Sequence, residues 1–188
     1  MGAVCRALTD DEIANVINYL DNWRDKTLFI LGVRTGFRVS ELIQMKVGDV
    51  WRLNRVTDEV TVTKAKMKGK AKGRTVTIHD QAAEFIRELI TSEALKPSDF
   101  LFQSRKGSGP ITRVQAWRVL KDAYNAIGAN GSVATHSMRK TFASKIYELS
   151  GRDLRLTQAA LGHVSVSSTV SYLAVDDNKV KDLIRKQK

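Results

Sequence analysis

The sequence Thr-His-Ser-Met-Arg at residues 135–139 is followed by Leu-Gly-His at 161–163 and then by Tyr172, nine residues after that histidine. His136 and Arg139 are three residues apart, so in a helix they lie on one face, about one turn from each other. A guanidinium, two imidazoles and a phenol are suited to chemistry on a phosphodiester, with the tyrosine as the nucleophile.

The charge of the chain favours a polyanionic partner. Lys and Arg number 31 against 20 Asp and Glu, which gives a net charge of +11 and a pI near 9.9. Nucleic acid explains such an excess directly, because basic side chains neutralise phosphates and release counterions. Many basic proteins bind no nucleic acid, so charge alone does not show whether this protein binds nucleic acid.

Length and composition indicate a globular protein. A chain of 188 residues is long enough for one domain with a substantial core, and its 43% hydrophobic content excludes a disordered chain. Cys5 is the only cysteine, which excludes an internal disulfide and fits a reducing compartment. The longest apolar run, at 28–33, is too short to span a bilayer, and the N-terminus lacks the apolar core of a signal peptide. We therefore expect a soluble intracellular protein with no membrane partner.

The spacing of apolar residues predicts a mainly α chain with a small antiparallel β-sheet, an α+β fold. Thr9 and Glu12 have the spacing of a capping box, which opens the first helix. Between residues 47 and 78 the apolar period changes to two, which is typical of strands. The predicted helices lie at about 10–20, 25–33, 39–45, 81–95, 113–127, 136–149, 153–161, 165–173 and 176–185, and the predicted strands at 47–53, 60–63 and 75–78.

A run of basic residues joins the last two predicted strands. Its cationic side chains occupy every second position, which in a strand places them on one face. The same face carries Val60 and Val62 before the run, so it changes from apolar to cationic where the hairpin extends beyond the core. A solvated sheet edge protected by lysines is one explanation. Charge concentrated at one tip favours the other, contact with DNA. Lys68 belongs to this run, and the candidate DNA-binding residues are Lys64, Lys66, Lys70, Lys72 and Arg74.

Arg38 lies in Thr-Gly-Phe-Arg-Val-Ser-Glu-Leu at 35–42. Together with the motifs at 135–139 and 161–163 and with Tyr172, it resembles the catalytic domain of the tyrosine recombinases, the phage integrase family. The resemblance covers about residues 8–184. It implies a single catalytic domain over 1–188 with the fold of DNA breaking-rejoining enzymes. The implied activity is site-specific recombination, in which DNA strands are cleaved and rejoined through a 3′-phosphotyrosine.

The resemblance also implies a role for each motif residue. Arg38 and Arg139 would clamp the scissile phosphate, and Tyr172 would attack it. His136 would assist proton transfer from the tyrosine, and His163 would hydrogen-bond the phosphate.

Two further residues are supporting candidates. Glu41 matches an acidic position that orients Arg38 or its neighbours. The family places a lysine general acid on the hairpin, and Lys68 is favoured because Lys68-Gly69 reproduces the family's lysine–glycine pair. Lys66 and Lys70 remain alternatives.

Each residue also has an ordinary structural explanation. Arg38 could be a surface arginine, His136 could cap a helix, His163 could end one, and Tyr172 could pack in the core. All four explanations would have to hold together, and the order and spacing of the motifs favour the family.

We expect no cofactor. The three histidines, His79, His136 and His163, are widely spaced and form no metal-binding motif. Arginines would replace a metal ion electrostatically. The phosphotyrosine conserves bond energy, so no ATP is needed, and no P-loop sequence is present.

The expected partner is double-stranded DNA. The resemblance implies a tetramer on DNA, with residues 174–188 as a tail that packs onto a neighbouring protomer. Without DNA and a partner domain, we expect a monomer in solution. An accessory DNA-bending protein is a further candidate partner. The family's N-terminal DNA-clamping domain is not found in the sequence, so we expect an excised catalytic domain or a naturally short relative. The implied location is the cytoplasm, at the nucleoid of a bacterial or phage-infected cell. The alternative functions are a type IB topoisomerase and a DNA-binding relative without catalysis.

Overall fold

The computed structural model describes residues 5–62, 73–163, 166–170, 172–173 and 185. The chain divides into two compact units, Met1–Phe142 and Ala143–Lys188. The division falls within one helix, α7 (Thr135–Leu149). Each unit is described by itself.

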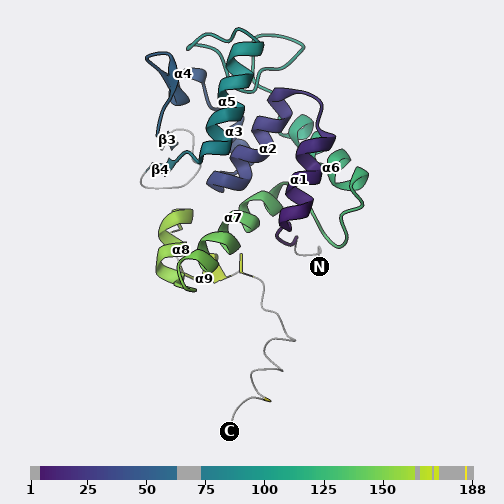
Figure 1. Ribbon diagram of the computed structural model, residues 1–188, viewed down its shortest axis with the longest axis vertical. Helices are drawn as coiled ribbons and strands as arrows, with labels where there is room; N and C mark the ends of the chain where they lie inside the picture. Colours follow the sequence, from purple (N-terminus) through teal and green to yellow (C-terminus); the bar gives the residue numbers. More distant parts are fainter. Residues whose placement is uncertain (1–4, 63–72, 164–165, 171, 174–184, 186–188) are drawn as a thin grey trace. The chain divides into compact units, whose positions relative to one another are not determined.

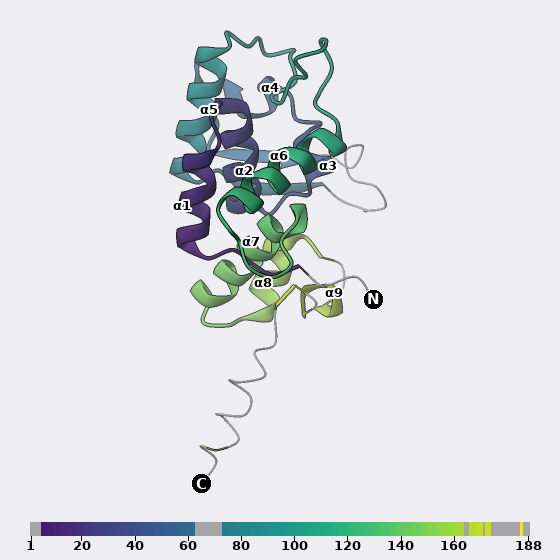
Figure 2. The ribbon, with the colours of Figure 1, turned by 90° about the vertical axis from the view of Figure 1, so that its right-hand side faces the viewer.

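The core of the first unit is built around α2 (Trp23–Thr35). Leu28, Phe29, Ile30 and Leu31 are fully buried, so the middle of this helix is covered on all sides. A helix of this kind needs neighbours all around it. It contacts α1 (Asp10–Tyr19), α3 (Val39–Leu42), α5 (Asp80–Ser92) and α6 (Arg113–Ala126) (Figure 1 and Figure 2).

The helix ends follow capping chemistry that is visible in the sequence. The predicted capping box of α1 is confirmed: the Thr9 hydroxyl accepts from Glu12 N, and the Glu12 carboxylate accepts from Thr9 N. Gly36 ends α2 in the left-handed conformation, with φ of 62°. A side chain there would overlap with the ring of Phe142, so glycine is required for both conformation and space.

The strands form two small antiparallel sheets where we predicted one. β3 (Glu59–Val62) pairs with β4 (Arg74–Thr77), and Val62 lies opposite Arg74, as the predicted hairpin requires. A second pair joins β1 (Trp51–Arg52) to β2 (Arg55–Val56). The segment between β3 and β4, with the lysines from Lys64 to Lys72, lies outside the described residues.

The prediction of a strand over residues 47–53 is wrong for its first half. Val47–Val50 is a short helix, α4, and strand geometry begins at Trp51. Val47 and Val50 are both fully buried, which is the i, i+3 spacing of a helix rather than the alternation of a strand. The Asp49 carboxylate also accepts from Lys46 N at 2.8 Å, which stabilises the start of this turn.

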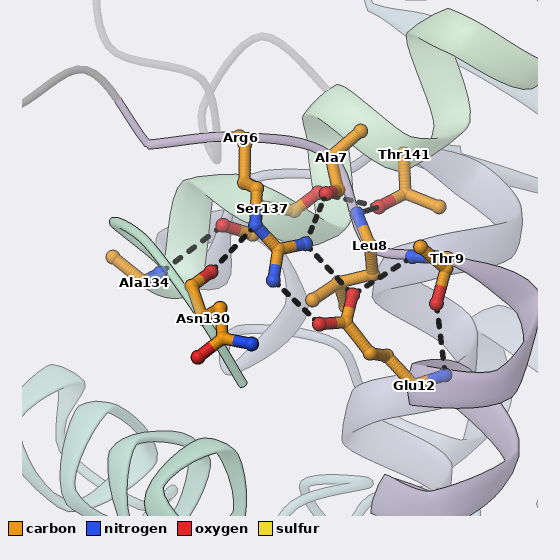
Figure 3. A network of polar contacts seen from close by, with 9 residues as sticks. All are labelled: Arg6, Ala7, Leu8, Thr9, Glu12, Asn130, Ala134, Ser137 and Thr141. Atoms are coloured by element: carbon orange, nitrogen blue, oxygen red, sulfur yellow. Dashed lines mark hydrogen bonds and ion pairs between the residues drawn. The ribbon is translucent and has the colours of Figure 1, made fainter. Parts of the chain in front are cut away.

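The segment before α1 is tied to the start of α7. The Arg6 guanidinium forms an ion pair with Glu12, donates to the carbonyl of Asn130 at 2.7 Å, and thereby spans the loop that leads into α7 (Figure 3). Leu8 N donates to the Thr141 hydroxyl, which donates to the carbonyl of Ser137. Hydrogen bonding to Glu12 raises the pKa of Arg6. This network fixes the loop that delivers the first turn of α7.

The second unit contains the rest of α7, α8 (Leu154–Leu161) and α9 (Val166–Val170). The Asp153 carboxylate caps α8, and Gly162 ends it in the left-handed conformation. α8 and α9 pack against each other. The helix predicted at 165–173 is thus shorter, and the one predicted at 176–185 falls almost entirely outside the described residues. None of the helices in the described part of the chain has the length and apolar character needed to cross a bilayer.

Candidate active site

The turn between α2 and α3 presents Arg38. Its side chain is about one-third exposed and forms an ion pair of 3.0 Å with Glu41. The other oxygen of the Glu41 carboxylate accepts from Arg38 N at 2.7 Å. Glu41 is itself buried, so one carboxylate fixes both the main chain and the side chain of Arg38.

The second arginine comes from α7. Arg139 is 1% exposed and donates to the carbonyl of Gly36, at the end of α2. His136 lies one turn earlier on the same helix, and it is exposed. The predicted common face of His136 and Arg139 is confirmed by this helix and by the cavity that both residues line.

Arg38, His136 and Arg139 line one cavity of about 590 Å³. Its remaining wall comes from α6, α3 and the α2–α3 turn. The α6 residues are Arg113, Val114 and Trp117, and the others include Phe37, Val39 and Ser40. The cavity is therefore lined by both cationic side chains, such as Arg38 and Arg139, and apolar ones, such as Val114 and Trp117.

The electrostatics of this cavity keep His136 neutral. Partial burial lowers the pKa of His136, and the positive charges of Arg38, Arg139, Arg113 and Lys140 lower it further. A histidine with a pKa below its usual 6.5 is mostly unprotonated at neutral pH. It is therefore able to accept a proton.

Arg74 lies behind the cavity. Its side chain is 6% exposed and donates to the carbonyls of Thr35 and Gly36. The guanidinium also stacks at 4.8 Å from the ring centre of Phe37 and 5.6 Å from that of Phe142. Burial lowers the pKa of Arg74 to about 9, together with the charges of Arg139 and Arg38, against the opposing effect of Glu41.

The second unit brings His163 and Tyr172 together. Their ring centres are 5.2 Å apart at an interplanar angle of 52°. His163 is buried, and its Nδ1 is hydrogen-bonded to the hydroxyl of Thr169 at 3.0 Å. Tyr172 N donates to the carbonyl of Thr169 at 3.0 Å, so Thr169 holds the His163 ring through its hydroxyl and the main chain of Tyr172 through its carbonyl.

The sequence model of the phage integrase family matches residues 6–179 of this chain. The chain belongs to that family. It is 32% identical to the probable integrase/recombinase YoeC of Bacillus subtilis (strain 168), a match that covers 91% of this chain and 90% of YoeC. It is 34% identical to tyrosine recombinase XerD of Staphylococcus saprophyticus, over 87% of this chain and 54% of XerD.

The fold of the phage integrase family is also recovered among solved structures. The XerH site-specific recombinase, solved with its difH substrate as a pre-cleavage complex, matches with a TM-score of 0.71 and 25% identity. The match covers 99% of this chain and 55% of the XerH chain. The predicted family and fold class are therefore confirmed. The chain spans about half the length of XerD and XerH.

The predictions for the basic hairpin have two different outcomes. The hairpin lysines, including the candidate general acid Lys68 and its alternatives Lys66 and Lys70, lie outside the described residues. Arg74 was predicted to lie on the exposed cationic face of the hairpin. This prediction is wrong, because the Arg74 side chain is buried. It lies on the same strand face as Val60 and Val62, and near the base of the hairpin this face still covers the core.

The sequence reasoning missed the wall that α6 contributes to this cavity. Val114 and Trp117 are large apolar residues that are 55% and 42% exposed. Both lie in a predicted helix beside Arg113, away from its buried face. An apolar pair on the polar side of a helix was the available signal.

Proposed function

We propose that this chain carries out the strand-cleavage chemistry of a tyrosine recombinase on double-stranded DNA. The observation that supports this most strongly is the cavity in which two arginines and a neutral histidine meet. The ring pair of His163 and Tyr172 in the second unit supplies a phenol and a second imidazole.

Arg38 and Arg139 would bind the non-bridging oxygens of the scissile phosphate. A guanidinium offers two parallel donors to a phosphate and keeps its charge, so it stabilises the charge that develops in the transition state. Loss of a single preorganised donor of this kind typically costs about 100- to 1000-fold in rate.

Tyr172 would attack the phosphate to form a 3′-phosphotyrosine and release a 5′-hydroxyl. A phenol with a pKa near 10 is only about 0.1% ionised at neutral pH, so it must lose its proton during attack. His136 is suited to assist that transfer, because its lowered pKa keeps the imidazole neutral. His163, held by Thr169, would donate a hydrogen bond to the phosphate.

The departing 5′ oxygen needs a proton, which we assign to a hairpin lysine, Lys68, with Lys66 and Lys70 as alternatives. The arginines supply the charge that a metal ion would otherwise provide. We therefore expect the reaction to need neither metal nor ATP.

Site-specific recombination of two DNA duplexes is the proposed outcome of this chemistry. The net charge of +11 supports DNA as substrate, as does the likeness to XerH, whose structure is a complex with its difH substrate. We propose that the chain is a monomer in solution and acts as a tetramer on DNA, with an accessory DNA-bending protein as a further candidate partner.

A suicide DNA substrate, nicked beside the cleavage site, tests the proposal. Cleavage releases a short oligonucleotide, so the covalent adduct accumulates and is detected on a denaturing gel. We expect an adduct with the wild type and with Tyr19→Phe, an exposed control tyrosine, and none with Tyr172→Phe. An adduct that survives Tyr172→Phe, or its absence in the wild type, would contradict the proposal. Relaxation of supercoiled DNA without recombinant products would instead favour topoisomerase chemistry.

A further inference from the structure

Arg74 is not among the residues that line the cavity, but it contacts Phe37, which lines the cavity, and Gly36, which anchors Arg139. Its guanidinium donates to the carbonyls of Thr35 and Gly36 and stacks on the rings of Phe37 and Phe142. We propose that Arg74 is a positioning residue, which holds the two phosphate-binding arginines through the α2–α3 turn and does not contact DNA. This inference rests on the proposed function, because it assigns a further role within the same site.

The Gly36 peptide links Arg74 to both arginines. The carbonyl of Gly36 accepts from Arg139, and Nη1 of Arg74 lies 3.5 Å from the same oxygen. Arg38 follows only two residues later in the chain. A shift of this one turn therefore moves the anchor of Arg139 and the main chain of Arg38 together.

The contacts of Arg74 require an arginine. Carbonyls at the end of a helix carry partial negative charge and lack partners within the helix, so a cation there is stabilised. A planar fork reaches two successive carbonyls, of Thr35 and Gly36, and still stacks on the rings of Phe37 and Phe142. A lysine would provide the charge, but its ammonium group has no planar fork to reach both carbonyls and no flat surface to stack on the rings.

The charge of Arg74 also points to an anionic ligand. Burial disfavours the cation of Arg74, and so does repulsion from the guanidiniums of Arg139 and Arg38, against the opposing effect of the Glu41 carboxylate. A phosphate in the cavity would offset this repulsion.

The full chain and the suicide DNA substrate test this proposal in single-turnover experiments at increasing DNA concentration. For Arg74→Gln we expect the maximum rate to fall about 10- to 100-fold, because small displacements of catalytic groups have effects of this size. The half-saturating DNA concentration should change less than about 2-fold, since no DNA contact is removed. Arg74→Lys should recover part of the rate, and Arg87→Gln, which removes an exposed charge from α5, should behave as the wild type.

Three results would overturn the proposal. An unchanged maximum rate with a raised half-saturating DNA concentration would make Arg74 a DNA contact, and wild-type values for both would remove any role. If Arg74→Gln does not unfold cooperatively, it is not properly folded, and Arg74→Lys replaces it as the test variant. Wild-type kinetics for Arg74→Lys would then overturn the proposal.

Inorganic phosphate provides a readout that does not depend on cleavage. Binding of phosphate to the folded state should raise the Tm of the wild type and of Arg87→Gln. In Arg74→Gln or Arg74→Lys we expect this rise to shrink by about half or more, and an equal rise would contradict us. Absence of an adduct in the wild type would instead contradict the proposed function, so the two failures are distinguishable.

Discussion

The two units contribute different groups to the proposed chemistry, and they hold them in different ways. In the first unit, Arg139 is 1% exposed and is anchored to the carbonyl that ends the central helix α2. In the second unit, Tyr172 is only partly buried and follows α9, a helix of five residues. Of the two proposed phosphate-binding residues, Arg139 is thus part of the buried core and Arg38 is partly exposed, whereas the proposed nucleophile follows a short helix.

From this difference we expect the stability of the fold and the rate of cleavage to be coupled in the first unit and largely independent in the second. Substitutions at the phosphate-binding groups remove core contacts and catalytic donors together, so they should lower both stability and rate. Substitutions around the nucleophile should lower the rate with little change in stability. Substitutions in each unit test this contrast.

The largest combined effect is expected for Arg139→Ala. The rate of adduct formation should fall about 1000-fold, because a preorganised donor to the phosphate is lost. The free energy of unfolding should fall by about 2–3 kcal/mol, because a fully buried side chain is removed. Chemical denaturation and single-turnover cleavage measure both. Arg118→Ala, on the surface of α6, is the control, and a stable Arg139→Ala protein would break the contrast between the units.

A smaller combined effect is expected for Gly36→Ala. The left-handed conformation and the overlap with Phe142 should together cost about 3 kcal/mol of stability. Displacement of the turn should also slow cleavage about 100-fold. Gly128→Ala is a matched control, since Gly128 also has a positive φ but has open space around it. It should lose only about 1–2 kcal/mol and keep its rate, and equal behaviour of the two variants would refute the role of the Gly36 turn.

In the second unit, Thr169→Val should separate rate from stability. The variant removes the hydroxyl that positions His163, so cleavage should slow about 10-fold while stability falls by only about 1 kcal/mol. Thr157→Val removes a comparable buried hydroxyl from α8, without contact to His163. Its rate should stay at the wild-type level. A rate loss shared by both variants would show that the effect is not specific to His163.

The smallest effect is a shift in the pH dependence of cleavage. The charge of Arg113 is one of the causes that lower the pKa of His136, so Arg113→Gln should raise that pKa toward 6.5. If His136 acts as the proposed base, the neutral imidazole is the active form, and the rate is lost as the pH falls through the pKa of His136. The acidic limb of the wild-type profile should therefore lie below pH 6.5 and move to higher pH in the variant.

The pH profile is measured at saturating DNA, so that any weaker binding by Arg113→Gln does not contribute. Arg118→Gln, on the same helix but outside the cavity, should leave the limb in place. A limb that does not move in Arg113→Gln would show that His136 is not the titrating base.

Much of the fold could be predicted because local signals agreed with tertiary packing. The capping box at Thr9 and Glu12 and the glycine at 36 mark helix ends that the structure confirms. The strand prediction failed over residues 47–50 because β-branched valines are compatible with both helix and strand, and only their burial distinguishes the two.

The site was partly predictable for the same reason. Arg38, His136 and Arg139 were predicted from motif order, and the structure places all three at one cavity. The position of Arg74 was not predictable, because alternation gives the face of a strand but not where the core ends along it. The contribution of Trp117 was missed because the periodicity of α6 reports its buried face, whereas the wall lies on the exposed one.

The most direct test of the central claim is to identify the residue that becomes attached to DNA. Wild-type adduct from the suicide substrate would be digested with nuclease and protease, and the modified peptide sequenced by mass spectrometry. The account predicts a nucleotide joined through its 3′ phosphate to Tyr172. A modification on Tyr147, on a serine or on a histidine, or a linkage through the 5′ phosphate, would contradict it.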